Sequence, residues 1–254
     1  MNWIQPRVAA GQTLVGTWIA SGSCVLAEIA SQVGFDWVLL DMEHGLGDWG
    51  ELRQMLQATS NAACAPIVRV GSCDEVEIKR ALDLGAAGIM IPMVNTAEQA
   101  AKAVAAMRYP PDGIRGVASS IRAVNYGLNF TDYFAQANDK LLTICQIESA
   151  QGVKNAAQIA AVDGVDILFV GLADLSLDLG HYKEFDHPIV TNAVRQIIEA
   201  CQNAGKHCGT LLSNPNTVPN ALAQGMTFIG MGVDTATYRE AIKSTLAGFE
   251  EMQS

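Results

Sequence analysis

A single-domain (β/α)8 barrel (TIM barrel) is the fold that the sequence predicts, and three observations predict it. The chain has 254 residues, of which 50% are hydrophobic and 17% charged. That is enough apolar material for one large core, and about 250 residues is an ordinary length for such a barrel. Short apolar runs alternate with amphipathic stretches through eight units, and no linker divides residues 1–254. A doubly wound open sheet is the competing fold, but it ordinarily has fewer units in this length.

Each expected strand is a short run that is apolar on both faces, as a buried strand of a parallel sheet must be. In chain order these runs are Leu14–Ile19, Trp37–Leu40, Ile67–Val70, Gly88–Ile91, Leu141–Ile147, Ile167–Val170, Cys208–Leu212 and Phe228–Met231. The amphipathic stretches that follow them predict helices at Val25–Gln32, Gly50–Thr59, Asp74–Leu84, Thr96–Met107, Gly152–Ala160, Pro188–Ala204, Thr217–Ala223 and Thr235–Phe249. Glycines that suit the left-handed position after a helix close several units: Gly34, Gly85, Gly205 and Gly225.

One connection, residues 108–140, is much longer than the others. It should begin at the end of the barrel opposite the strand C-termini, because it follows the helix after the fourth strand. Long loops in compact domains often carry function, and a contact between subunits and a catalytic role both remain open for it.

Composition and charge exclude several classes of protein. The net charge is −10 and no basic tract occurs, so nucleic acid is not an expected partner. No apolar stretch approaches the roughly 20 residues that a membrane helix needs. The start of the chain lacks the pattern of a signal peptide, and the six cysteines are scattered without a CxxC pair. We therefore expect a cytoplasmic protein with reduced cysteines and no membrane segment.

Ionisable side chains follow the second strand directly, at Asp41, Glu43 and His44. In barrels of this class, chemistry is built at the C-terminal ends of the strands. A carboxylate at Asp41 could fix the tautomer of His44 and raise its basicity, which suits an acid–base pair. The alternative is an exposed loop histidine without a role, which is the interpretation we give to the other three: His181, His187 and His207.

Two carboxylates, Glu148 and Asp174, follow the fifth and sixth strands. Adjacent strands lie about 4.8 Å apart, so both carboxylates can reach one cation. The alternatives are two solvated carboxylates, or a helix N-cap for Asp174. The neighbouring Gln146 adds a polar group, and we favour a hard divalent metal ion that leaves positions for substrate and water.

Arg69 ends the third strand, where a cation suits a substrate carboxylate or a developing oxyanion. An exposed salt bridge is the alternative explanation for it. No lysine falls near the C-terminal end of a strand, so Schiff-base catalysis is not expected.

Taken together, these residues resemble the HpcH/HpaI family of metal-dependent pyruvate aldolases across nearly the whole chain. The stretches that carry the resemblance are residues 35–44, 66–69, 91–94, 108–116, 146–148, 171–176 and 232–235. Two stretches depart from the family pattern. Leu172 stands where relatives have Pro, and residues 70–73 lack a Pro-rich sequence. Both departures concern substrate preference rather than the chemical groups.

The resemblance implies a role for each matching residue. Glu148 and Asp174 bind Mg2+ or Mn2+, with Co2+ as a further candidate; His44 is the base, and Arg69 stabilises the transition state. The implied residues that support the base are Asp83, which acts in relatives on the histidine and can do so across a subunit boundary, and Asp41. The implied substrate contacts are Gln146, Gly171 and the backbone of Ala173, with Trp18, Leu211 and Val233 lining the pocket. The implied assembly is a homo-oligomer, a hexamer of two trimers.

The implied reaction is the reversible cleavage of a 4-hydroxy-2-oxo acid, derived from a sugar acid or a hydroxy-oxo-dicarboxylate, to pyruvate and an aldehyde. His44 would take the proton from the C4 hydroxyl, and the cation and Arg69 would stabilise the pyruvate enolate. Two alternatives remain open. One is a lyase of a related barrel that acts on an acyl-CoA or a phosphoenolpyruvate-type substrate, and the other is a barrel that has lost catalysis and serves in binding.

Overall fold

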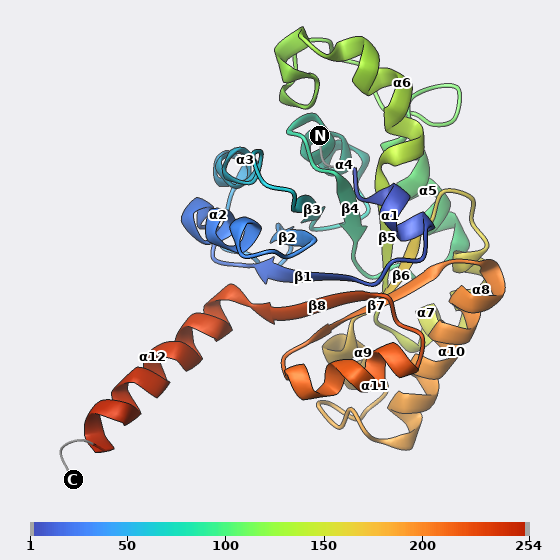
Figure 1. The fold of residues 1–254 in the computed structure, drawn as a ribbon. Helices are drawn as coiled ribbons and strands as arrows, with labels where there is room; N and C mark the ends of the chain where they lie inside the picture. The colour runs from blue at the N-terminus through green and yellow to red at the C-terminus, as the bar shows by residue number, and fades with distance from the viewer. Residues whose placement is uncertain (1–2, 252–254) are drawn as a thin grey trace.

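Eight parallel strands pair in sequence order and close into a barrel, β1 pairing with β8 (Figure 1). The structure is a computed structural model that describes residues 3–251. The strands are β1 (Leu14–Ile19), β2 (Trp37–Asp41), β3 (Ala65–Arg69), β4 (Gly88–Ile91), β5 (Leu142–Ile147), β6 (Ile167–Val170), β7 (His207–Leu212) and β8 (Phe228–Val233). The predicted (β/α)8 barrel is confirmed, and every predicted strand lies within two residues of its observed bounds.

Large aromatic side chains fill the barrel interior. Trp37 of β2 stacks on Phe228 of β8, with ring centroids 4.3 Å apart and an interplanar angle of 5°. Trp18 of β1 meets Trp37 edge-on at 5.9 Å. Gly16 makes room for this packing, because a Cβ there would lie 2.0 Å from the Trp37 ring. An aromatic layer of this kind supports the floor of the cavity at the strand C-termini.

Helices surround the barrel. They are α1 (Gln5–Ala9), α2 (Cys24–Gln32), α3 (Trp49–Ala58), α4 (Glu75–Asp83), α5 (Ala97–Met107), α6 (Phe130–Lys140), α7 (Ala150–Lys154), α8 (Ala156–Ala160), α9 (Leu172–Asp178), α10 (Pro188–Ala204), α11 (Val218–Ala223) and α12 (Asp234–Glu251). Short 3-10 segments are η1 (Arg122–Gly127) and η2 (Pro215–Thr217). The four glycines predicted to close helices all have positive φ, as the left-handed position requires.

The long connection between α5 and β5 is not a bare loop, because it contains η1 and α6. The helix α6 was not predicted, and only two of its side chains, Tyr133 and Ala137, are buried. The predicted helix Gly152–Ala160 is divided at Asn155 into α7 and α8. The short helix α9 after β6 was not predicted either, and it carries two of the expected site residues, Ala173 and Asp174.

The last helix, α12, leaves the barrel. Figure 1 shows it as an arm that projects away from the other helices. Every residue from Thr237 to Phe249 is exposed. Its apolar side chains Tyr238, Ile242 and Leu246 follow one another at four-residue spacing and therefore form a stripe along one face.

Within the described residues, no helix is long and apolar enough to cross a membrane. Within the described residues, Cys24, Cys73, Cys145, Cys201 and Cys208 form no disulfide.

Candidate active site

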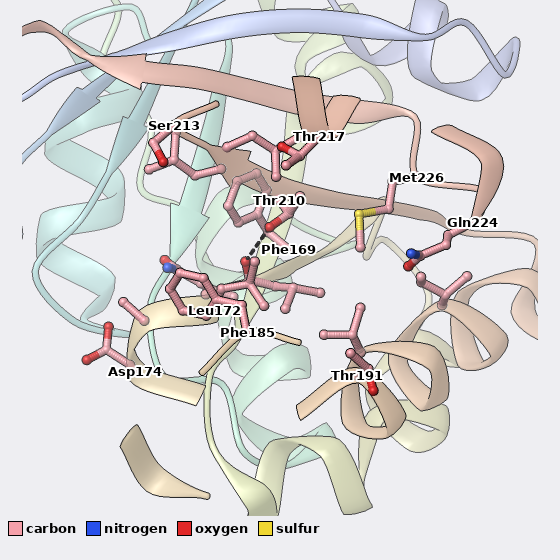
Figure 2. A pocket seen from close by; sticks show the side chains of 18 of the residues that line it. Phe169, Leu172, Asp174, Phe185, Thr191, Thr210, Ser213, Thr217, Gln224 and Met226 are labelled. Atoms are coloured by element: carbon pink, nitrogen blue, oxygen red, sulfur yellow. Dashed lines mark hydrogen bonds between the residues drawn. The ribbon is translucent and has the colours of Figure 1, made fainter. Parts of the chain in front are cut away.

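A cavity of about 1350 Å³ opens at the C-terminal ends of the strands and continues between α10 and α11 (Figure 2). Ten of the predicted site residues line it: Trp18, Asp41, His44, Arg69, Gln146, Gly171, Ala173, Asp174, Leu211 and Val233. Glu148 is buried beside Gly171, whereas Asp83 lies elsewhere. All of the expected residues except Asp83 therefore lie at or beside this one cavity.

Arg69 and Asp41 form a buried ion pair at the mouth of the barrel. They are register partners at the ends of β3 and β2. The Arg69 Nε and Nη2 atoms donate to the two Asp41 carboxylate oxygens at 2.9 and 2.6 Å. Burial by itself lowers the pKa of Arg69, but the hydrogen bonds and charge of Asp41 outweigh it, and the pKa is raised. The guanidinium is thus a fixed cation facing the cavity.

The predicted side-chain pair of Asp41 and His44 is not formed, and this corrects the sequence interpretation. Asp41 Oδ1 instead accepts the backbone N–H groups of Glu43 and His44, at 3.1 and 3.3 Å. Glu43, which had no predicted role, is the carboxylate nearest the imidazole. Its Oε2 lies 2.9 Å from Arg69 Nη1 and 3.8 Å from His44 Nε2. Asp41 therefore orients Arg69 and the turn, while Glu43 lies between the arginine and the histidine.

His44 itself is accessible. Its side chain is 70% exposed, and it is the one histidine among the described residues that line the cavity. An exposed imidazole at the cavity mouth can exchange protons with substrate and solvent.

Glu148 is a buried carboxylate at the floor of the site. Its Oε1 accepts the backbone N–H of Met93 at 2.8 Å. Burial raises the pKa of Glu148 to about 7, and the nearby charges of Glu43 and Asp174 add to the effect. Gly171 permits this arrangement, because a Cβ there would lie 2.3 Å from Glu148 Oε2.

Two further oxygen donors lie near Glu148. Gln146 is on β5 two residues before it, and its buried Oε1 has no hydrogen-bond partner among the described residues. Asp174 is exposed in the first turn of α9 and marks one edge of the cavity in Figure 2. It is not an N-cap, because Gly171 holds that position.

This donor set fits a hard divalent cation. Carboxylate and amide oxygens are the ligands that Mg2+ and Mn2+ prefer. A cation would also relieve the repulsion between Glu148 and Asp174 and satisfy the unpaired Gln146 oxygen.

Aromatic and apolar residues complete the floor. Trp18 is buried, and the guanidinium of Arg69 lies over its ring at 5.7 Å from the centroid. Leu211 and Val233 pack on the same interior cluster. Thr210 and Ser213 also line the cavity, and the strand-end argument could have found them because they lie at the end of β7. No sequence signal marked the lining residues of α10.

Asp83 does not contact His44 within the chain. It ends α4, and its Oδ1 accepts from Nη2 of the buried Arg115 at 2.9 Å. Because α4 begins after the C-terminal end of β3 and runs back, Asp83 lies toward the opposite end of the barrel. A role at the active site would require a second copy of the chain.

Comparisons with known proteins agree with this geometry. The sequence profile of the HpcH/HpaI aldolase/citrate lyase family matches residues 14–241. A 2-keto-3-deoxy-L-rhamnonate aldolase of Salmonella gallinarum is 41% identical over 254 residues, which span all of this chain and 95% of that protein. Among solved structures, an HpcH/HpaI aldolase/citrate lyase family protein from Burkholderia cenocepacia J2315 has a TM-score of 0.94 at 35% identity, with both chains fully covered. The citrate synthase SbnG has a TM-score of 0.90 at 28% identity, over 100% of this chain and 99% of that one. The chain therefore belongs to the HpcH/HpaI aldolase/citrate lyase family and is a carbon–carbon lyase.

Proposed function

We propose that this lyase reversibly cleaves a 4-hydroxy-2-oxo acid to pyruvate and an aldehyde, with a divalent metal ion held by Glu148 and Asp174. The observation that carries the proposal is the meeting of three kinds of group at one cavity: two carboxylates, a fixed arginine and an accessible histidine. When bound, the metal ion supplies a Lewis acid for the carboxylate and keto oxygens of the 2-oxo acid.

The side chains of the chain supply the rest of the chemistry. His44 accepts the proton of the C4 hydroxyl as the bond between C3 and C4 breaks, and it returns the proton in the reverse direction. Arg69 faces the negative charge that develops on the oxygen of the 2-oxo acid, and Asp41 holds it in place. Gln146 and the backbone around Ala173 orient the carboxylate of the substrate.

We propose a sugar-acid derivative as the substrate, because the cavity offers many hydroxyl and amide groups beyond the reacting centre. Thr191, Ser213, Thr217 and Gln224 line its outer part, and such side chains suit a hydroxylated aldehyde. The relatives named 2-keto-3-deoxy-L-rhamnonate aldolases support this choice.

An aldol assay tests the proposal. Purified protein is given pyruvate, Mg2+ or Mn2+, and a panel of aldehydes that runs from succinic semialdehyde to lactaldehyde and glyceraldehyde. The wild type should consume pyruvate with a hydroxylated aldehyde, and His44→Ala should reduce kcat by about 10²–10⁴-fold. His207→Ala is the matched control. Full activity in His44→Ala, or after EDTA with no metal restored, would refute the mechanism.

We further propose a homo-oligomer, with a hexamer of two trimers as the assembly, in the cytoplasm. In a barrel the helix after the eighth strand packs beside the helix after the first. Here α12 projects away, and α2 keeps an exposed apolar row, Val25, Ile29 and Val33. The chain thus has an exposed apolar face on α12 and an exposed apolar row on α2. This combination favours an exchange in which α12 of one copy covers α2 of another. The scattered cysteines, with no CxxC pair, suit a reducing compartment.

Light scattering during size-exclusion chromatography tests the assembly. The wild type should elute as an oligomer at micromolar concentration. A double change on the apolar stripe, Ile242→Lys with Leu246→Lys, should yield smaller species, whereas Ser244→Lys on the other side of α12 should not. A monomeric wild type would refute this part of the proposal.

A further inference from the structure

The loop between α9 and α10 brings together, outside the active site, three side chains of types that can bind a metal ion. Its backbone makes two successive turns: the Glu184 N–H donates to His181 O, and the His187 N–H donates to Glu184 O, both at 2.9 Å. Turns closed by bonds between residues three apart place every third side chain on the same side. The loop therefore presents His181, Glu184 and His187 as a set.

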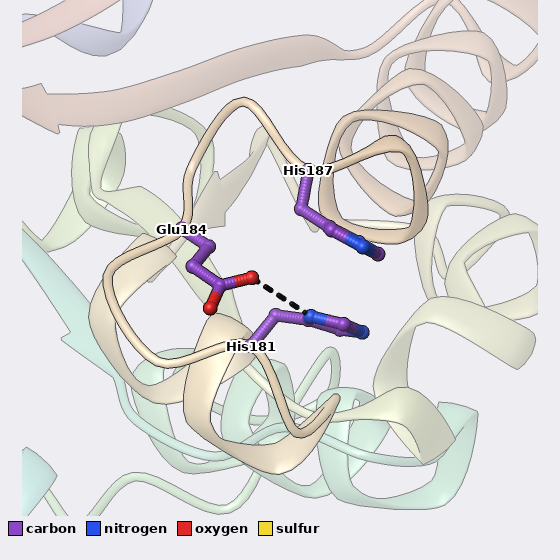
Figure 3. Close-up of side chains that lie close together, drawn as sticks. All are labelled: His181, Glu184 and His187. Atoms are coloured by element: carbon purple, nitrogen blue, oxygen red, sulfur yellow. Dashed lines mark hydrogen bonds and ion pairs between the residues drawn. The ribbon is translucent and has the colours of Figure 1, made fainter.

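The side chains of this set converge. The imidazole rings of His181 and His187 are stacked, with centroids 3.5 Å apart and an interplanar angle of 16°. His181 Nδ1 lies 3.1 Å from Glu184 Oε2, as Figure 3 shows. One ring nitrogen of each histidine and one carboxylate oxygen all lie within 4.8 Å of one another.

We propose that His181, Glu184 and His187 form a second metal site, selective for Zn2+ or a similar transition metal. Zinc takes imidazole nitrogens at about 2.0–2.1 Å in a tetrahedron, which places two such nitrogens about 3.3 Å apart. One ring nitrogen of each histidine lies within 4.8 Å of the other, so a rotation of the two side chains would bring the nitrogens to that separation. Two histidines and one glutamate leave a fourth position for water.

The donor chemistry separates this site from the one at Glu148. That site offers oxygen ligands alone, which suit Mg2+ or Mn2+, whereas two imidazoles favour Zn2+, Ni2+ or Cu2+. The two sites should therefore fill with different ions. The inference does not depend on the proposed aldol chemistry, because it rests on the loop alone.

Metal binding here would fix one wall of the active-site cavity. The loop is tied to α9 through Ser176, whose backbone oxygen accepts the His181 N–H at 2.7 Å and whose Oγ accepts the Lys183 N–H at 3.2 Å. Phe185, between the two histidines, lines the cavity. A metal ion that joins His181 to His187 would restrain Phe185 and with it the width of the cavity.

Zinc binding to a variant without the carboxylate site tests the proposal. The background is the full chain with Glu148→Gln and Asp174→Asn, and the probe is Zn2+ alone, measured by calorimetry and by elemental analysis after dialysis. The background protein should bind one Zn2+ per chain. Adding His181→Ala should weaken Zn2+ binding at least tenfold, and adding Glu184→Gln should weaken it less.

His207→Ala on the same background is the matched control, and it should leave zinc binding unchanged. His181→Ala is preferred to His187→Ala, because His187 also caps α10 through its Nδ1. Co2+ in place of Zn2+ should give the visible absorption bands of a four-coordinate ion, which His181→Ala should abolish. No saturable Zn2+ in the background protein, or unchanged affinity after His181→Ala, overturns the proposal. Failure of aldolase activity would leave this result untouched.

Discussion

Replacing Glu148 by Gln separates two effects of the buried carboxylate: it lowers the stability of the metal-free fold, and it binds the metal ion. The glutamine keeps the shape of the side chain, and its Oε1 can still accept the Met93 N–H that now bonds Glu148 at 2.8 Å. It cannot ionise and offers no charge to a cation. In the metal-free protein, the change therefore removes a desolvated charge.

The magnitude follows from the raised pKa. Burial shifts the pKa of Glu148 from its usual 4.5 to about 7, which corresponds to about 3 kcal/mol of unfolding free energy. Because the folded-state pKa is raised, the stabilising effect of the bound proton is fully present below pH 4.5. It declines as the pH rises and is lost above about 7. Metal-free Glu148→Gln should thus exceed the wild type in stability by about 1 kcal/mol at pH 5.5 and about 3 kcal/mol at pH 8.5.

Thermal unfolding in EDTA at the two pH values measures this difference. For a chain of this size, about 3 kcal/mol corresponds to roughly 6–12 °C in Tm. Excess Mg2+ should reverse the order, because a ligand at about 1,000 times its Kd stabilises the wild type by about 4.1 kcal/mol, which exceeds the difference of about 3 kcal/mol, and the variant has lost a ligand. Glu28→Gln, at an exposed position, is the control, and its Tm should equal that of the wild type both in EDTA and in Mg2+. A metal-free variant less stable than the wild type at pH 8.5 would refute the reasoning.

Three further predictions concern the arginine, the loop after β6 and the projecting helix. Arg69→Lys keeps a positive charge but cannot bind Asp41 in the same two-pronged way, so kcat should fall about 10²-fold while the KM for pyruvate changes little, as measured by steady-state kinetics. Leu172→Pro should be tolerated and raise Tm by roughly 1–4 °C, because Leu172 is the first residue of α9, where the N–H has no helical partner. Differential scanning calorimetry checks it, and a lower Tm would show that the packing of Leu172 on the core outweighs the restricted backbone. Limited proteolysis of the Ile242→Lys and Leu246→Lys double variant should cut α12 faster than in the wild type, since an unpacked helix opens readily.

The sequence predicted the barrel and its rim because both depend on local rules. A buried parallel strand must be apolar along its length, so the charge that follows it marks the strand end. Asp41 and Arg69 could be placed at one edge by that rule alone. The rule also located Glu148 and Asp174, although they lie 26 residues apart.

Pairing at the rim was not predictable in the same way. The sequence puts Asp41, Glu43 and His44 within four residues, and proximity in the chain favoured Asp41 as the partner of the histidine. The choice depends on the register of β2 against β3, which sets Asp41 opposite Arg69. The arginine takes both oxygens of Asp41, and the imidazole is left nearest to Glu43.

The position of α12 shows a limit of a different kind. Its stripe of Tyr238, Ile242 and Leu246 has the spacing of any helix that covers a barrel. That pattern specifies an apolar face but does not specify which chain supplies the surface beneath it. The same argument extends to Asp83, which ends α4 and pairs with Arg115 rather than with His44 in its own chain. In the proposed oligomer, a neighbouring chain's Asp83 is a candidate partner for His44. A mixture of Asp83→Ala and His44→Ala chains, each inactive alone, should then recover activity when they assemble together.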